Sequence, residues 1–317
     1  MSRGTANLLL LVAGLVWGLG FIAQETAMED IGPFTFMTLR FALAALAIVP
    51  FAYFEWRRVA ASGNRQSLLT FRDWQAIFTV GLMFFAAMLF QQVGLLATTV
   101  TNAGILTGLY VVLTPLIAFF ALGQNQPKLV WPAALLAFCG IWLLGGGGGG
   151  GGGGNSGLAN LNWGDWLILL GAVFAALHVL AMGHAVTDLR RPALVACAQF
   201  AISGLFAAIG LGVVRLLDWS YEPAISTQTL IAATPEILYA ALFAGALAFL
   251  LMAICQQYAR PSDAAILMSS EALFAAAAGA ILLGERLTII GYFGALLLFS
   301  AIVLVSANAA KTKESTV

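Results

Sequence analysis

Two five-residue stretches, Asn102-Ala103-Gly104-Ile105-Leu106 and Asp263-Ala264-Ala265-Ile266-Leu267, repeat one pattern at a spacing of 161 residues. The same spacing aligns Gly123 with Gly284, so the correspondence extends beyond the stretches themselves. Ten consecutive glycines at 145–154 lie between the two copies, and such a composition behaves as a flexible linker. We therefore divide the chain into two related halves and a glycine-rich linker: 1–145, 146–162 and 163–317.

The composition indicates an integral membrane protein. Of the 317 residues, 61% are hydrophobic and 9% are charged, whereas about 25% of the residues in soluble domains are charged. The apolar residues gather in runs that approach the roughly 20 residues an α-helix needs to cross the hydrocarbon layer. The runs are 5–24, 34–54, 74–96, 100–122, 129–145, 163–184, 192–215, 236–257, 263–283 and 288–308. We predict an all-α integral membrane fold with ten transmembrane helices, five in each half.

The positions of the basic residues predict which side of the membrane the termini face. Cytoplasmic loops carry the excess of lysine and arginine. With the N-terminus inside, 11 of the 14 basic residues fall on the inner side, only Arg215 and Arg286 fall outside, and Arg40 lies within a helix. We therefore expect a multi-pass protein of a bacterial-type inner (plasma) membrane, with the N-terminus and a short C-terminal tail in the cytoplasm.

The odd number of helices in each half predicts an inverted repeat, because the second half must enter the membrane with the opposite orientation. Inverted repeats are typical of secondary transporters, whose substrate sites lie near the bilayer midplane between the repeats. We therefore expect a central cavity that opens to each side in turn. An intramembrane enzyme would need a nucleophile with a base, or a metal set, and no such motif is recognisable. A channel is a further alternative, although no filter-like motif is visible.

The sequence predicts no metal, cofactor or nucleic-acid site. The three cysteines, Cys139, Cys197 and Cys255, lie far apart in separate apolar runs. His178 and His184 are six residues apart and so lie on different helix faces, unlike a helical zinc pair. The charges balance at 14 basic and 14 acidic residues, which gives no basic surface for nucleic acid. We expect a small-molecule substrate and membrane lipid as the partners.

Three local motifs resemble those of the drug/metabolite transporter superfamily, and of its ten-helix EamA branch. They are Gly14-Leu15-Val16-Trp17-Gly18-Leu19-Gly20-Phe21, then Leu39-Arg40-Phe41-Ala42-Leu43-Ala44-Ala45 after Pro33, and Leu283-Gly284-Glu285-Arg286-Leu287-Thr288. The resemblance implies a secondary transporter that exports amino acids and related metabolites, with hydrophobic and aromatic amino acids first. A broad-specificity exporter of drugs or toxic compounds is the alternative substrate class.

Glu271 is the first candidate for chemistry, because it lies eight residues from the start and twelve from the end of its apolar run and so near the membrane midplane. A carboxylate at that depth costs roughly 2.5–3.5 kcal/mol and normally faces a partner or a water-filled cavity. The 161-residue spacing matches it with Tyr110, which we also place at the central cavity. Glu271 either couples protons or binds an amine, or a hydrogen bond between helices neutralises it.

Arg40 is the matching cation, early in the second apolar run. It either binds a substrate carboxylate or serves a structural role by reaching toward the interface, and we favour the structural role. Because opposite charges within the membrane attract strongly, Glu271 and Arg40 are together candidates for proton coupling or for an ion pair.

Two glutamines are candidate substrate contacts. Gln92 belongs to the pair Gln91-Gln92 and Gln257 to the pair Gln256-Gln257, and we match these pairs between the halves. An amide has two donor hydrogens and two acceptor lone pairs, so it either binds both ends of a zwitterion or links two helices. A pair in each half favours a substrate contact for at least one member of each.

Aromatic and methionine side chains are the remaining candidates for the cavity wall. Phe84, Met88 and Gln92 are spaced four residues apart, so they share one helix face. Such a stripe, like Trp17 on the first helix, either lines a cavity or packs against other helices and lipid. His178 titrates near neutral pH and is either a wall residue or a hydrogen-bonded structural histidine.

Overall fold

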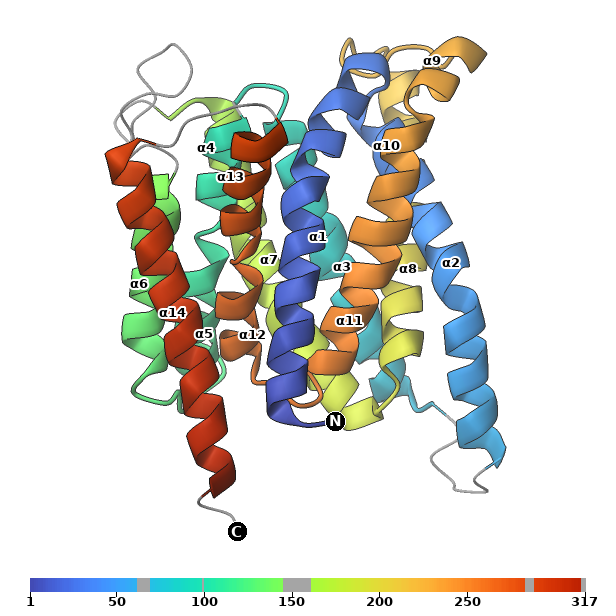
Figure 1. Cartoon of the computed structure of the whole chain (residues 1–317). Helices are drawn as coiled ribbons and strands as arrows, with labels where there is room; N and C mark the ends of the chain where they lie inside the picture. The colour runs from blue at the N-terminus through green and yellow to red at the C-terminus, as the bar shows by residue number, and fades with distance from the viewer. Residues whose placement is uncertain (62–68, 99, 145–160, 283–287, 315–317) are drawn as a thin grey trace.

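A computed structural model describes residues 1–61, 69–98, 100–144, 161–282 and 288–314, and within these ranges every regular element is a helix (Figure 1). The elements are α1 (Arg3–Asp30), α2 (Pro33–Ala61), α3 (Phe71–Gly94), α4 (Val100–Thr107), α5 (Tyr110–Phe120), α6 (Val130–Leu144), α7 (Trp163–Leu189), α8 (Pro192–Leu216), α9 (Thr227–Ala232), α10 (Thr234–Leu238), the π-helix η3 (Tyr239–Leu247), α11 (Ala248–Cys255), α12 (Pro261–Met268), α13 (Glu271–Leu282) and α14 (Ile289–Glu314). The glycine-rich linker and the motif at 283–287 lie outside the described residues.

These elements correspond to the ten predicted crossings. Eight segments of the described chain are long and apolar enough to span a membrane, and α6 is a shorter apolar helix. Two crossings are broken into half-helices, α4 with α5 and α12 with α13, while α10, η3 and α11 together form one crossing. The prediction of an all-α membrane fold built from two inverted five-helix repeats is confirmed.

The direction of the helices shows the inversion (Figure 1). Both chain ends lie at one face of the bundle, which we call the termini face. α1 starts at the termini face, whereas α7, the first helix of the second half, starts at the opposite face. The two halves therefore enter the bundle from opposite sides.

The two broken crossings break at the same point of the repeat. At each break a backbone N–H donates at 3.2 Å to the carbonyl three residues earlier, from Leu109 to Leu106 and from Ser270 to Leu267. Bonds of this type tighten the chain into a 3₁₀ turn and end the preceding helix. The next helix then begins at Tyr110 in the first half and at Glu271 in the second, again 161 residues apart.

The ends of α3 and α11 are also related by the 161-residue spacing. Leu95 N–H donates to the Gln91 carbonyl at 3.0 Å, and Gln256 N–H donates to the Met252 carbonyl at 2.9 Å. Gln91 therefore corresponds to Met252. The predicted match between the two glutamine pairs is wrong by four residues, about one helical turn.

α2 and α8 pack side by side, and each receives a carboxylate cap at its first turn. The N–H groups of Phe34 and Thr35 in α2 donate to Glu222 at 2.9 and 3.0 Å. Two first-turn N–H groups of α8 donate to Glu55, near the end of α2, at 3.2 and 2.9 Å. Such N–H groups have no acceptor within their own helix, and the helix dipole favours a negative charge beside them. In both helices a glutamate carboxylate thus accepts hydrogen bonds from the first-turn N–H groups.

α6 and α14 form a separate pair at the edge of the bundle (Figure 1). A Cβ atom on Gly140 would lie 2.6 Å from the backbone nitrogen of Leu298, and one on Gly294 would lie 2.6 Å from the carbonyl oxygen of Gly140. The two backbones touch there, and only glycine permits that approach.

We predict that Glu222→Ala lowers the free energy of unfolding by about 1–3 kcal/mol, because buried N–H groups of α2 lose their acceptor. Thermal unfolding of the purified protein in detergent measures the loss. Gln228→Ala, on the exposed surface of the neighbouring α9, is the matched control. Equal losses in the two variants would show that the cap contributes nothing specific.

Candidate functional site

A cavity lies among the helices of the two halves. About 880 Å³ within it is not filled by protein atoms, a volume that includes space open to the solvent. Eight of the ten crossings line it, and none of the described residues of α6 and α14 does. The edge pair therefore stands apart from the site.

Seven predicted site residues line the cavity: Trp17, Arg40, Phe84, Met88, Tyr110, His178 and Glu271. Gln92 and Gln257 lie outside its lining. The amide nitrogen of Gln92 lies 2.6 Å from the Met28 sulfur, and that of Gln257 donates to the Val186 carbonyl at 3.0 Å. The structure places both amides at contacts between helices.

Three further polar residues line the cavity: Gln24 and Thr107, which the sequence did not single out, and Gln91, the other member of the Gln91-Gln92 pair. Gln91 Nε2 donates to Thr107 Oγ1 at 3.1 Å and so joins α3 to the end of α4. The four-residue spacing of Phe84, Met88 and Gln92 favours Gln92 as the wall residue. Successive helix residues point about 100° apart, so Gln91 and Gln92 face different directions. The neighbouring Gln91 is the one that reaches the cavity.

Phe84 is the centre of an aromatic wall. Its ring centroid lies 4.8 Å from that of Phe249, 5.3 Å from those of Phe200 and Phe41, and 5.2 Å from that of His178. Edge-to-face and tilted contacts at such distances favour ring packing beyond simple burial. This wall offers an apolar surface to an aromatic or aliphatic group.

His178 serves both predicted roles. It lines the cavity, and its Nε2 lies 2.8 Å from Oε1 of Gln199 on α8. Since an amide oxygen accepts hydrogen bonds, Nε2 is the donor, which leaves Nδ1 as the acceptor of the neutral ring.

Trp17 joins the first half to the π-helix of the second. Its Nε1 donates to the Ala244 carbonyl at 2.7 Å, and its ring lies 4.8 Å from that of Phe249. Single stretches of π-helix occur frequently at functional sites. Here the wide turn of η3 supplies a backbone acceptor that fixes the indole at the wall.

Two half-helices begin at the cavity, α5 with Tyr110 and α13 with Glu271. The N-terminus of a helix carries partial positive charge, so a carboxylate in its first turn is stabilised. α1 packs directly over the second break, since a Cβ atom on Gly18 would lie 2.5 Å from the Glu271 carbonyl oxygen. Backbone geometry thus fixes where the Glu271 side chain starts.

Arg40 lines the same cavity and is 6% exposed. Its Nη1 donates to Gln24 Oε1 at 3.0 Å, and its guanidinium carbon lies 4.8 Å from the Phe36 ring centroid and 4.7 Å from that of Phe41. The ion pair with Glu271, which the sequence left open as one alternative, is not seen among the described residues, and Arg3 pairs with Asp263.

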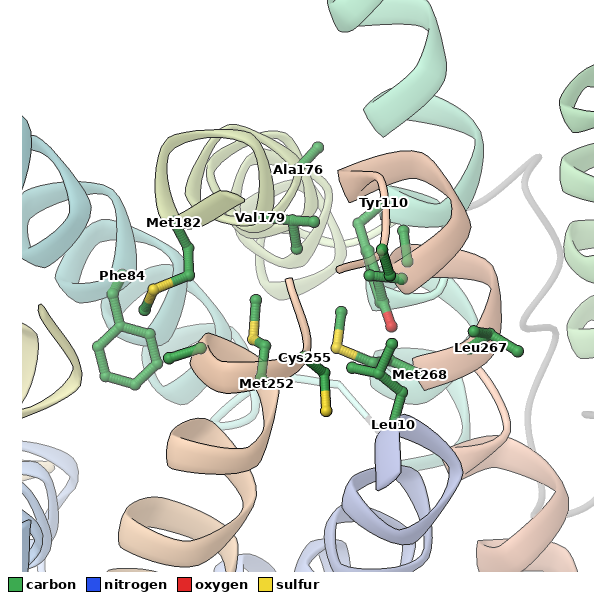
Figure 2. Packing of buried hydrophobic residues seen from close by; sticks show 14 of the residues in the cluster. Leu10, Phe84, Tyr110, Ala176, Val179, Met182, Met252, Cys255, Leu267 and Met268 are labelled. Carbon is green, nitrogen blue, oxygen red and sulfur yellow. The ribbon is translucent and has the colours of Figure 1, made fainter. Parts of the chain in front are cut away.

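Polar contacts join the two halves at both faces of the bundle: Glu222 caps the start of α2 at the opposite face, and other contacts lie at the termini face. Arg3 at the start of α1 pairs with Asp263 in the first turn of α12, and Ser262 Oγ donates to Gln126 Oε1 at 2.9 Å. Deeper in the bundle, Leu10, Met252 and Met268 belong to one apolar cluster (Figure 2). Met252 and Met268 also line the cavity, so this cluster forms part of its wall.

The sequence matches the EamA-like transporter family over residues 4–146 and 162–307, one segment for each half. The chain belongs to this family. A protein of Archaeoglobus fulgidus, named only as an uncharacterized transporter, is 32% identical to this transporter over 307 residues, which cover 96% of this chain and 87% of the relative. A solved crystal structure shares the fold with a TM-score of 0.75 at 15% identity, over 98% of this chain and 99% of the other. The resemblance inferred from the motifs is confirmed, and the protein is a multi-pass membrane transporter.

We predict that Gly18→Ala destabilises the transporter by about 1–3 kcal/mol, because the added methyl group meets the backbone of α13 in a packed interior. The melting temperature in detergent measures the effect. Gly104→Ala is the matched control, since nothing lies within 4 Å of a Cβ atom there and the equivalent residue of the second half is Ala265. A Gly104 variant that melts as low as the Gly18 variant would contradict the close approach of α1.

Proposed function

We propose that this transporter exports small metabolites, foremost hydrophobic and aromatic amino acids, by alternating access through the central cavity. The observation that carries the proposal is that one cavity combines an aromatic wall around Phe84 with a guanidinium group, Arg40, and a carboxyl group, Glu271. An amino acid has three parts that are complementary to these groups: an apolar side chain, a carboxylate and an amine. We infer that the wall receives the side chain and that Glu271 faces the amine.

The charge distribution supports a cytoplasmic location for the termini, in a bacterial-type plasma membrane. Basic residues gather at the ends of the elements that meet the termini face: Arg3, Arg57, Arg58, Arg72, Lys128, Arg190, Arg191 and Arg260. Arg215, at the end of α8, lies at the opposite face. By the positive-inside rule the termini face is the cytoplasmic one.

The contacts at the termini face support the alternating-access part of the proposal. Arg3 and Gln126 belong to the first half, and both bind residues at the start of α12 in the second half. Arg3 is partly exposed whereas Asp263 is buried, so water reaches this ion pair from the Arg3 side. Such contacts can separate when one repeat rocks against the other.

A broad-specificity exporter is the second candidate. The aromatic wall would also accept the rings of an apolar cation, and Glu271 would face its charge. The position of Arg40 argues against this second function, because a cationic ligand has no group that can pair with the Arg40 guanidinium.

Export is tested in proteoliposomes loaded with radiolabelled L-phenylalanine, L-leucine or the cationic dye ethidium. We expect saturable efflux of the two amino acids that exceeds efflux from protein-free vesicles. Faster efflux of ethidium than of either amino acid would favour the broad-specificity exporter. Flux that rises linearly with concentration would indicate a channel.

We predict that Glu271→Gln abolishes the response of efflux to a proton gradient. If Glu271 carries the counter-transported proton, efflux from the wild type is faster when the receiving side is more acidic, since protons moving inward drive the substrate outward. The amide keeps the shape of the side chain but takes up no proton. Asp188→Asn, on the exposed end of α7, is the control. An unchanged pH response in the Glu271 variant would leave that residue a binding or structural role.

We predict that Arg3→Gln increases access from the cytoplasmic side to Cys255, which is buried at the end of α11. The rate of maleimide labelling, measured after Cys139→Ala and Cys197→Ala remove the other thiols, should rise severalfold. Arg58→Gln, an exposed arginine at the same face, should leave the rate unchanged. Equal labelling of all three proteins would show that the Arg3 ion pair does not hold this face closed.

A further inference from the structure

Arg40 is bound through one edge of its guanidinium group alone. Nη1 donates to Gln24, whereas Nε and Nη2 are buried and have no hydrogen-bond partner in the part of the chain that the structure describes. Arginine stays charged in proteins, and a buried charge without a partner is strongly unfavourable. The transporter therefore carries an unmatched cation at the wall of its cavity.

The free edge has the geometry of a carboxylate-binding site. Nε–H and one N–H of Nη2 point in parallel from the same side of the planar guanidinium group, and this fork matches the two oxygens of a carboxylate. The rings of Phe36 and Phe41, at 4.8 and 4.7 Å from the guanidinium carbon, fix the plane of the fork. The Gln24 contact fixes its rotation, and because Nε and Nη2 are buried, a carboxylate reaches them only when neighbouring side chains give way.

The aromatic wall begins beside this fork. Phe41 contacts the Arg40 guanidinium group on one side and the Phe84 ring on the other, with 5.3 Å between ring centroids. A molecule that carries a carboxylate a few bonds away from an apolar group can therefore contact both at once.

We propose that the Nε and Nη2 edge of Arg40 binds the carboxylate of the transported molecule and so selects carboxylate-bearing substrates over their neutral and cationic analogues. This inference rests on the proposed function and adds to it the group that orients the substrate. The structural role expected for Arg40 from the sequence accounts for Nη1 but leaves the other two nitrogens without a function.

The test compares four ligands that share a phenyl ring: L-phenylalanine, 3-phenylpropionate, L-phenylalaninamide and phenethylamine. Binding to the purified full-length transporter is measured by calorimetry. The wild type should bind the two carboxylates at least tenfold more tightly than phenethylamine. Arg40→Gln should lose at least tenfold in affinity for both carboxylates while its affinity for the two carboxylate-free ligands stays the same.

Two further variants distinguish binding from folding. Arg40→Lys keeps the charge without the fork and should recover part of the affinity for 3-phenylpropionate. Arg57→Gln, on the same helix, removes an exposed arginine that lies 5.9 Å from the Tyr53 ring, and should change no affinity. The melting temperature of each variant confirms that the folded state persists.

Each outcome decides the inference separately from the proposed function. Unchanged binding of 3-phenylpropionate by Arg40→Gln overturns the inference, as does a wild type that binds phenylalaninamide as tightly as phenylalanine or binds no carboxylate. Arg40-dependent binding of 3-phenylpropionate supports the inference even if vesicles show no amino-acid efflux. In that case the proposed amino-acid export fails while the carboxylate site stands.

Discussion

Backbone hydrogen bonding in the hydrocarbon layer is the constraint on which the site depends. No water is present there to satisfy the N–H and C=O groups that a broken helix releases, so a break is tolerated only against protein or a cavity. Here the breaks after α4 and α12 keep i+3 hydrogen bonds, and α1 packs over the second through Gly18. The same breaks bring Tyr110 and Glu271 to the cavity as first-turn residues.

The two halves share a scaffold but differ in the side chains they present. Both have the same turn at the break, a capped start to their second helix and a glycine contact between the edge helices. At the cavity, by contrast, the equivalent residues differ: Tyr110 of the first half corresponds to Glu271 of the second, and Gln91 corresponds to Met252. The shared backbone gives the two halves the same fold, while the different side chains give the cavity an asymmetric lining.

The sequence predicts what depends on one-dimensional patterns. Apolar runs gave the crossings, the 161-residue spacing gave the equivalence of Tyr110 and Glu271, and midplane depth identified the acid. The direction in which a side chain points around its helix is harder to predict: the four-residue spacing favours Gln92, whereas Gln91 lines the cavity. The pairing of Arg3 with Asp263 joins residues 260 positions apart, so no local signal records it.

The separation of Arg40 and Glu271 bears on the class of substrate. Two opposite charges in a cavity of low dielectric attract strongly, yet these form no ion pair, because Gln24 and two phenylalanine rings hold Arg40 while the first turn of α13 holds Glu271. Under the proposed function, a zwitterion would offer its carboxylate to Arg40 and its amine to Glu271. A cationic ligand would match Glu271 and leave Arg40 desolvated and unpaired, which costs binding free energy. The proposal of a zwitterionic substrate rather than a cationic drug therefore has an electrostatic argument that is independent of the aromatic wall.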